Sequence, residues 1–276
     1  MKTILALTDF TPASFNSVNY AADLAYSINA NLVLFHAIPF PIAVSEISVP
    51  GDFIDNMMDT SQRDMDELSE TIKSRTKGKI NVTTEIKIGT VEQEIENISS
   101  KERPLAVILG IRSGKSFGRA LMGSTTFHIM NHQAFPTLVI PEGVHFRDIK
   151  TIGMACDLKQ TDRQLPFETI KEWLYLFSSK LEIIHMEDRN GKLQPEQSVE
   201  SIAIQNRLHA FKPRFHFLTG NDITTELNEF MKTHPLDLLM VFPRKHGIFG
   251  LFHQKKSTFI AAHHQLPILS IHDIGK

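Results

Sequence analysis

The chain contains a single cysteine, Cys156, among its 276 residues. One cysteine cannot form an internal disulfide, and no second ligand stands at metal-binding spacing from it. This excludes a disulfide-stapled fold and a cysteine-based zinc site, and we expect no metal site elsewhere. A chain with so little cysteine suits a reducing compartment, so we expect a cytoplasmic protein.

Long apolar runs and a strong charge of either sign are also missing. No window approaches the roughly 18 apolar residues that a membrane-spanning helix needs, and the N-terminal apolar run meets Asp9 too early for a signal peptide. The formal net charge of −2 gives no general attraction to nucleic acid or to anionic membranes. We therefore expect a soluble protein whose partners include neither nucleic acid nor membrane.

The sequence repeats a pattern along its length. The apolar run 4–7, which ends in Thr8-Asp9, recurs as 152–156 followed by Asp157, and the run 32–36 recurs as 181–185. A segment with linker composition, Pro141-Glu142-Gly143, separates the copies. Because the length also favours two domains, the sequence predicts an internal duplication with domains at 1–143 and 147–276.

Strand-like and helix-like patterns alternate within each copy. In the first copy, apolar runs end near residues 7, 38, 88, 109 and 140, with helical patterns between them. Strands alternating with helices predict the α/β class, with a doubly wound parallel five-stranded sheet in each copy. One of the predicted helices covers 52–77, and its expected apolar stripe is Phe53, Met57, Met65, Leu68 and Ile72.

A glycine-rich loop, predicted over 110–123, follows the fourth strand-like run. It leads into a helix start at Ser124-Thr125, an arrangement in which backbone N–H groups and the helix dipole favour an anion. Gly114-Lys115-Ser116 matches the end of the P-loop motif. However, only three residues separate Gly110 from Gly114 where that motif needs four, and no helix signal follows directly. The loop is therefore interpreted as a different phosphate cradle.

The glycine spacing resembles that of the universal stress protein family. Its nucleotide-binding members carry Gly, two residues, Gly, nine residues, Gly, then Ser or Thr. Gly110, Gly123 and Ser124 match the first glycine, the third glycine and the hydroxyl residue. Ser113 stands at the second glycine, with Gly114 directly after it. Because serine resists backbone angles that glycine allows, this departure bears on how closely the loop approaches phosphate.

The resemblance covers the whole chain as two copies. The segments 4–9, 32–38 and 136–140 look like the family's first, second and last strands, and members commonly dimerise through the last. The resemblance implies the universal stress protein fold, which is adenine-nucleotide-hydrolase-like. It also implies ATP as the ligand, with Mg²⁺ as its accompanying ion. The residues expected at the site are Leu7, Thr8, Asp9, Ala37, Gly110, Arg112, Ser113, Gly114, Gly123, Ser124 and Thr125.

The expected roles follow from chemistry and place. By resemblance Asp9 contacts the adenosine part of ATP, and it could accept a hydrogen bond from a ribose hydroxyl or the base amine. Backbone near Ala37 would flank the base, while Gly110, Arg112 and Gly114 would hold the phosphates. Each is also open to a structural interpretation. In particular, Asp9 serves equally well as a helix cap, and Ser124-Thr125 as an ordinary helix start.

The second copy lacks the glycines. Phe242 replaces the first glycine, and Lys255-Lys256 stand near the place of Gly123-Ser124. We expect this copy to bind no ATP in the family manner. Its basic cluster, which is Arg244, Lys245, Lys255 and Lys256, is either a solvated loop or an anion contact.

Two functions remain open at the sequence level. The first is a stress-response protein that binds ATP in its N-terminal domain and acts as a nucleotide-dependent sensor or adaptor for an unknown protein partner. Its last strands would meet edge to edge and form an intramolecular pseudo-dimer, with a homodimer as a further option. The alternative is an interaction scaffold of the same fold that binds no nucleotide. An ATP-using enzyme is less favoured. Such enzymes of this fold would be expected to carry a Ser-Gly-Gly pyrophosphate loop after the first strand, where this chain has Thr8-Asp9-Phe10-Thr11. Any ATPase activity would be slow.

Overall fold

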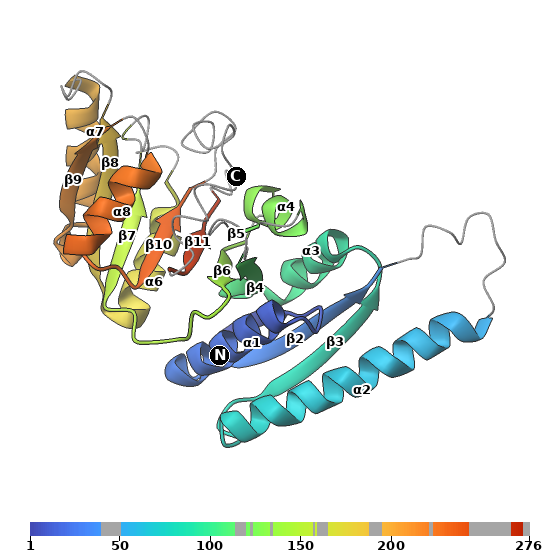
Figure 1. The fold of residues 1–276 in the computed structure, drawn as a ribbon. Helices are drawn as coiled ribbons and strands as arrows, with labels where there is room; N and C mark the ends of the chain where they lie inside the picture. Colours follow the sequence, from blue (N-terminus) through green and yellow to red (C-terminus); the bar gives the residue numbers. More distant parts are fainter. Residues whose placement is uncertain are drawn as a thin grey trace.

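The structure is an α/β fold in which helices lie on both faces of a largely parallel sheet (Figure 1). The computed structural model describes residues 1–39, 51–113, 120–121, 124–132, 135–156, 158, 165–187, 195–220, 223–242 and 266–272. The predicted fold class is confirmed.

The first half of the chain, residues 1–141, alternates strands with helices as the sequence predicts. In chain order its elements are β1 (Thr3–Leu7), α1 (Pro12–Ile28), β2 (Asn31–Ile38), α2 (Gly51–Arg75), β3 (Val82–Ile88), α3 (Val91–Glu102), β4 (Ala106–Ser113), β5 (Ala120–Leu121), α4 (Ser124–His132) and β6 (Thr137–Pro141).

The second half, residues 151–272, repeats this alternation. Its elements are β7 (Thr151–Ala155), α6 (Phe167–Phe177), β8 (Lys180–Glu187), α7 (Pro195–Arg207), a 3₁₀ turn (His209–Phe211), β9 (Arg214–Thr219), α8 (Ile223–Thr233), β10 (Leu238–Val241) and β11 (Ile268–Ser270). The exact domain boundaries, 1–143 and 147–276, remain a prediction.

One sheet runs through both halves in the order β3-β2-β1-β4-β6-β11-β10-β7-β8-β9, with β5 paired to β4 outside this path. Within each half the five strands of the path are parallel to their neighbours. In the first half the strand order reverses direction between β1 and β4. An α/β sheet forms its ligand crevice at such a switch point, outside the carboxyl ends of the strands.

The two halves join where β6 pairs antiparallel with β11. Leu138 lies opposite Leu269, and Thr137 lies opposite Ser270. Both strands would otherwise be open edges of their halves, and each edge would carry a row of unpaired N–H and C=O groups. Their pairing satisfies those groups and buries every residue of both strands. The last strands thus meet edge to edge, as the sequence predicts.

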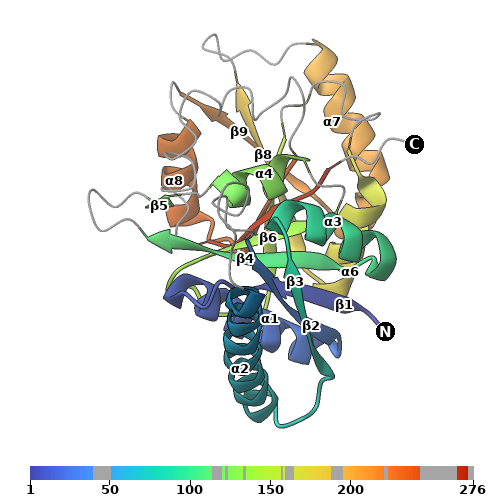
Figure 2. The same cartoon turned by 90° about the vertical axis from the view of Figure 1, so that its right-hand side faces the viewer.

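Apolar side chains from the helices build one core on each face of this sheet. Figure 2 shows α8 on one side of the strands of the second half, and α6 and α7 on the other. The core on one face includes Val18, Met65, Ile170 and Ile204 from α1, α2, α6 and α7. The core on the opposite face includes Ile95, Ile129 and Leu227 from α3, α4 and α8. The sheet is therefore covered on both sides, as parallel strands require.

Local signals set the bounds of α1, the helix that follows the first strand. The Thr11 side chain accepts a hydrogen bond from the backbone N–H of Ser14, and Pro12 occupies the first helical position. At the other end Asn29 takes the left-handed conformation with φ 53°, a common helix stop. Both ends of α1 are therefore set by residues next to them in the sequence.

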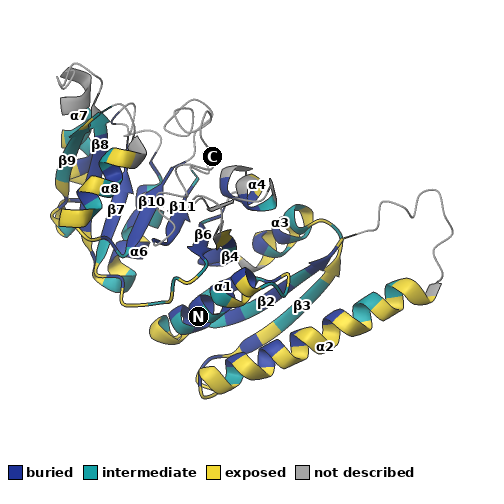
Figure 3. Ribbon diagram, viewed as in Figure 1, coloured by how far each residue is buried: buried dark blue, intermediate teal, exposed yellow. Residues whose placement is uncertain are grey.

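Helix α2 is longer than its packing surface. Met65, Leu68 and Ile72 are buried against the sheet, but Phe53 is 46% exposed and Met57 is only half-buried. The predicted apolar stripe is therefore fully buried only in the C-terminal half of the helix. The N-terminal turns of α2 extend past the sheet, so none of the described strands lies beneath them (Figures 1 and 3).

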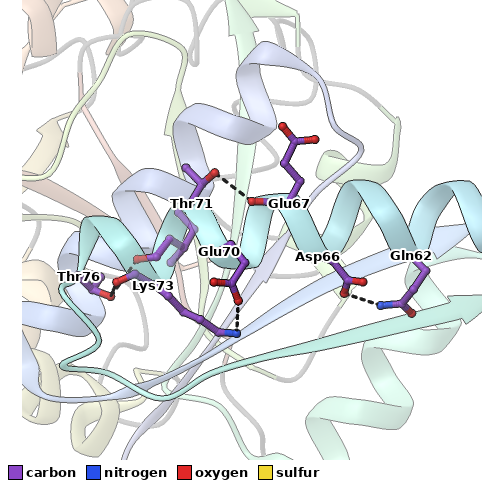
Figure 4. A network of polar contacts seen from close by, with 8 residues as sticks. Gln62, Asp66, Glu67, Glu70, Thr71, Lys73 and Thr76 are labelled. Atoms are coloured by element: carbon purple, nitrogen blue, oxygen red, sulfur yellow. Dashed lines mark hydrogen bonds and ion pairs between the residues drawn. The ribbon is translucent and has the colours of Figure 1, made fainter.

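The outer face of α2 is polar and internally bonded (Figure 4). The Gln62 Nε2 donates to Asp66 Oδ1 at 2.8 Å, and Lys73 Nζ lies 2.8 Å from Glu70 Oε1. Such pairs on one helix face contribute only about 0.2–0.5 kcal/mol each. The buried residues in the C-terminal half of α2 therefore hold it in place.

The connection between the halves is tied to α1 and to the start of β10. Asn16 Nδ2 donates to the carbonyls of Pro141 and Val144, at 3.2 and 3.0 Å. On the second half, Asp237 Oδ2 accepts hydrogen bonds of 2.9 Å from the backbone N–H groups of Lys150 and Thr151. The carboxylate of Asp237 thus fixes the point where the connection enters β7.

We expect the Asp237→Ala substitution to lower the free energy of unfolding by about 1–3 kcal/mol, because two backbone donors lose a charged acceptor. Urea denaturation followed by circular dichroism measures this loss. Asp148→Ala is the matched control, since Asp148 is an exposed aspartate in the same connection. Equal effects of the two substitutions would contradict the role of Asp237.

Candidate functional site

A cavity of about 690 Å³ lies at the carboxyl ends of β1, β2 and β4, where the strand order of the first half reverses. The first residues of α1, α3 and α4 also reach it, so three helix N-termini face the same space. Its described lining residues are Leu7, Thr8, Asp9, Thr11, Ala13, Ser14, Phe35, His36, Ala37, Pro39, Gly89, Thr90, Val91, Glu92, Leu109, Gly110, Ile111, Arg112, Thr125, Thr126 and Ile129. The positive ends of three helix dipoles at one cavity suit an anionic ligand.

Hydrogen bonds fix the turn between β1 and α1 at one wall of the cavity. Asp9 Oδ1 accepts from the Thr11 hydroxyl at 2.6 Å and from the Thr11 N–H at 3.1 Å. The Ser14 hydroxyl lies 3.3 Å from both the Asp9 N–H and the Thr8 hydroxyl. This wall is therefore ordered by its own side chains before any ligand arrives.

These bonds also set the charge of Asp9. Burial alone would raise the pKa of its carboxyl, but hydrogen bonds from Thr11 and Ser14 outweigh burial and hold the pKa below its ordinary value of 3.8. Asp9 is consequently an anion at neutral pH. A carboxylate has about four acceptor positions, so Asp9 can order its own turn and still accept from a ligand.

His36, at the end of β2, braces the same turn. Its Nδ1 lies 2.8 Å from the carbonyl oxygen of Thr8, and its ring contacts the Phe10 ring with centroids 4.6 Å apart. Because a carbonyl only accepts, Nδ1 carries the proton. Phe10 itself has φ 59°, in the left-handed region. His36 is thus a packed, hydrogen-bonded residue that supports the turn.

The second half repeats this arrangement at the equivalent positions. His185 Nδ1 lies 2.9 Å from the carbonyl oxygen of Cys156, and Leu158 has φ 48°, matching His36, Thr8 and Phe10. The structural equivalence of the runs that end at residues 36 and 185 supports the predicted duplication. Asp157, the counterpart of Asp9, lies outside the described residues.

Strand β4 continues beyond the predicted start of the glycine-rich loop. Gly110 pairs with Ile140 of β6, and Arg112 and Ser113 pair with β5. Placing the start of the loop at Gly110 was therefore wrong, because the backbone from 110 to 113 still finds strand partners. The glycine is required for another reason: a Cβ at position 110 would lie 2.2 Å from the carbonyl oxygen of Ala13 in α1. Gly110 lets α1 pack closely against β4.

The structure gathers most of the predicted site residues around the cavity. Those that line it are Leu7, Thr8, Asp9, Ala37, Gly110, Arg112 and Thr125. Ser113 ends β4 and Ser124 begins α4. Gly114 and Gly123 lie outside the described residues.

Sequence reasoning missed the contribution of α3. Thr90 caps this helix, and Thr90, Val91 and Glu92 line the cavity. The available signal was Gly89, which ends a predicted strand just before a threonine. Since carboxyl ends of parallel strands meet at one edge, the helix start after β3 belongs beside the starts of α1 and α4.

In the second half the position of the first glycine is filled. Phe242, the counterpart of Gly110, is 4% exposed and belongs to the core on the face of α6 and α7. An aromatic ring thus occupies the strand end at which the first half has only a glycine hydrogen. The basic residues Arg244, Lys245, Lys255 and Lys256 lie outside the described residues.

The comparisons with known proteins fit this architecture. The family model described as the universal stress protein family matches residues 1–141, which is half of the chain. This chain belongs to the universal stress protein family. No match was found among curated proteins.

Solved structures extend the likeness to both halves. A universal stress protein from Archaeoglobus fulgidus superposes with a TM-score of 0.75 at 16% identity, covering 98% of each chain. A protein of unknown function from Pseudomonas aeruginosa gives a TM-score of 0.56 at 10% identity, covering 98% of this chain and 92% of the other. At these identities the likeness concerns the fold, and it includes the second half.

Two further findings concern the part of the chain that the structure describes. There, no three His, Cys, Asp or Glu side chains are grouped so that they could hold a metal ion. In the same part no helix is both long and apolar enough to cross a membrane.

We expect Gly110→Ala to lower the free energy of unfolding by about 1–3 kcal/mol, because its new methyl group meets the backbone of α1. Gly153→Ala in β7 is the matched comparison, since there the nearest atom is the end of the flexible Leu236 side chain. Thermal unfolding should show the larger loss for Gly110→Ala. The reverse order would contradict the packing explanation.

The pH dependence of Asp9 gives a second test. Because its folded pKa lies below 3.8, Asp9 stabilises the fold above that pH, and this contribution is lost as the pH falls through the folded pKa. Thr11→Val removes a donating hydroxyl, so the Asp9 pKa should rise, as an NMR titration would show. Ser27→Ala, at the far end of α1, should leave it unchanged. An Asp9 carboxyl that titrates at or above 3.8 in the unsubstituted protein would refute the assignment.

Proposed function

We propose that this universal stress protein binds ATP in the cavity of its first half and acts as a nucleotide-dependent sensor or adaptor. The observation that carries the proposal is the gathering of seven predicted site residues and three helix N-termini around one cavity. At about 690 Å³ the cavity lies within the usual range for small-molecule sites, about 300–1,000 Å³.

The adenosine part and the phosphates of the nucleotide would contact different sides of the cavity. The turn at Asp9 offers an ordered carboxylate, which suits ribose hydroxyls or the base amine. The apolar end of β2 at Ala37 suits the flat face of the base. On the other wall Arg112 is the lone Lys or Arg among the described lining residues, and Thr125 lies at the start of α4. Phosphates belong on this second side, where a cation and a helix N-terminus coincide.

Magnesium, when bound, would neutralise part of the phosphate charge. Because Asp9 is assigned to the adenosine part, Glu92 is the described lining carboxylate that would fit this role, and the described residues offer no group of three such ligands. Phosphate oxygens of the nucleotide would therefore supply more of the magnesium ligands than the protein does. The proposed activity is binding, with at most slow hydrolysis.

The second half serves a different purpose in this proposal. With Phe242 buried where Gly110 stands in the first half, one chain would take up one nucleotide. The β6–β11 pairing would give a single chain the shape of a family dimer, which makes the chain an intramolecular pseudo-dimer. The divided roles motivate the boundaries 1–143 for a nucleotide domain and 147–276 for a domain that supports it or contacts a partner.

Calorimetric titration with ATP and Mg²⁺ tests the proposal. We expect saturable binding of one ATP per chain, weakened about tenfold or more by Asp9→Ala, because a charged hydrogen bond contributes about 1.5–3 kcal/mol. Asp23→Ala is the matched control: it also removes a carboxylate from the first half, but Asp23 pairs with Arg75 away from the cavity. Absence of binding at millimolar ATP would reject the proposal and favour the scaffold alternative.

A further inference from the structure

The C-terminal end of α4 is held by the second half of the chain. The Met130 carbonyl lies in the last turn of α4, where no helical N–H remains to bond it. It accepts a 2.8 Å hydrogen bond from the Ser270 hydroxyl and a 2.6 Å hydrogen bond from His272 Nε2. Ser270 ends β11 and His272 follows it, so both donors come from the second half. Figure 1 shows α4 beside β11.

The opposite end of the same helix forms a wall of the cavity. The cavity is lined by Thr125, Thr126 and Ile129 of this helix. Ile129 directly precedes Met130, whose carbonyl accepts the two hydrogen bonds. Helix α4 has nine residues, so it is only about 14 Å long. A helix this short is unstable alone and depends on tertiary contacts. Restraint at Met130 therefore bears directly on the position of Thr125 and Thr126.

The hydrogen bonds from Ser270 and His272 to Met130 form a clamp on α4, and this clamp has no equivalent donors at the matching positions of the first half. The segment 267–271 is the counterpart of 136–140, which makes Val139 the counterpart of Ser270 and Pro141 the counterpart of His272. Neither valine nor proline has a side-chain donor. The first half thus has no side-chain donor at these two positions, and the described contacts run from the second half to α4.

We propose that Ser270 and His272 are positioning residues that hold α4 in place for the ligand of the first half. The inference rests on the proposed function for the identity of that ligand, ATP. The second half, in which Phe242 stands at the position of Gly110, would then support the site of the first half. The second half completes the support of a site to which it contributes no lining residue among those described.

The test uses the full chain and two measurements. Hydrogen exchange without nucleotide reports on the α4 amides, which should exchange about tenfold faster in the Ser270→Ala/His272→Ala double variant. Calorimetry reports on ATP affinity, which should fall about fivefold for each single substitution, as the loss of one hydrogen bond implies. His272→Gln restores a donor near Nε2 and should keep the affinity within about twofold of the original. If the double variant fails to fold, the His272→Ala and His272→Gln pair carries the test.

Ser179→Ala is the matched control. Ser179 is also a buried serine of the second half that donates to a backbone carbonyl, that of Ile149, but it lies outside the α4 contact. This variant should lose stability without changing α4 exchange or ATP affinity. Unchanged α4 exchange in the double variant would overturn the proposal, as would faster exchange with unchanged ATP affinity. If the unsubstituted chain binds no ATP, the proposed function is rejected. The exchange rates of the α4 amides then decide by themselves whether Ser270 and His272 hold this helix.

Discussion

The antiparallel pairing of β6 with β11 is the contact on which the rest of this structure depends. Each half is a parallel sheet that would otherwise end in an open strand with unpaired backbone groups. Pairing Thr137–Pro141 with Ile268–Ser270 closes both edges and buries both strands in one continuous sheet. The two apolar cores then extend across the junction, with side chains of both halves in each.

The two halves that this pairing joins are not equivalent. In the first half Gly110 lets α1 approach β4 and leaves the strand end open toward a cavity. In the second half Phe242 occupies the equivalent place and packs into the core. Duplication thus keeps the architecture, since strands and helices need only a matching apolar pattern. A binding site needs particular small residues at particular strand ends, and one copy has lost them.

Much of the site could be predicted because its position follows from chain order. Strands that read as buried and parallel bring their carboxyl ends to one edge, so Thr8-Asp9, Ala37 and Gly110 had to lie near one another. The prediction was wrong for the start of the glycine-rich loop, because strand pairing continues to Ser113. An apolar pattern also does not say which of its residues other elements cover. Phe53 fits the helical stripe of α2, yet it is exposed because that part of the helix passes the end of the sheet.

The sequence by itself determined the alternation of strands and helices, the duplication and the family, because apolar period and glycine spacing are local properties of a chain. Only the tertiary structure decided what each of these residues touches. It showed that Gly110 is required by the backbone of Ala13, that Thr90 joins the cavity, and that Ser270 and His272 reach Met130. Contacts between residues 140 apart arise from packing, which no local pattern encodes.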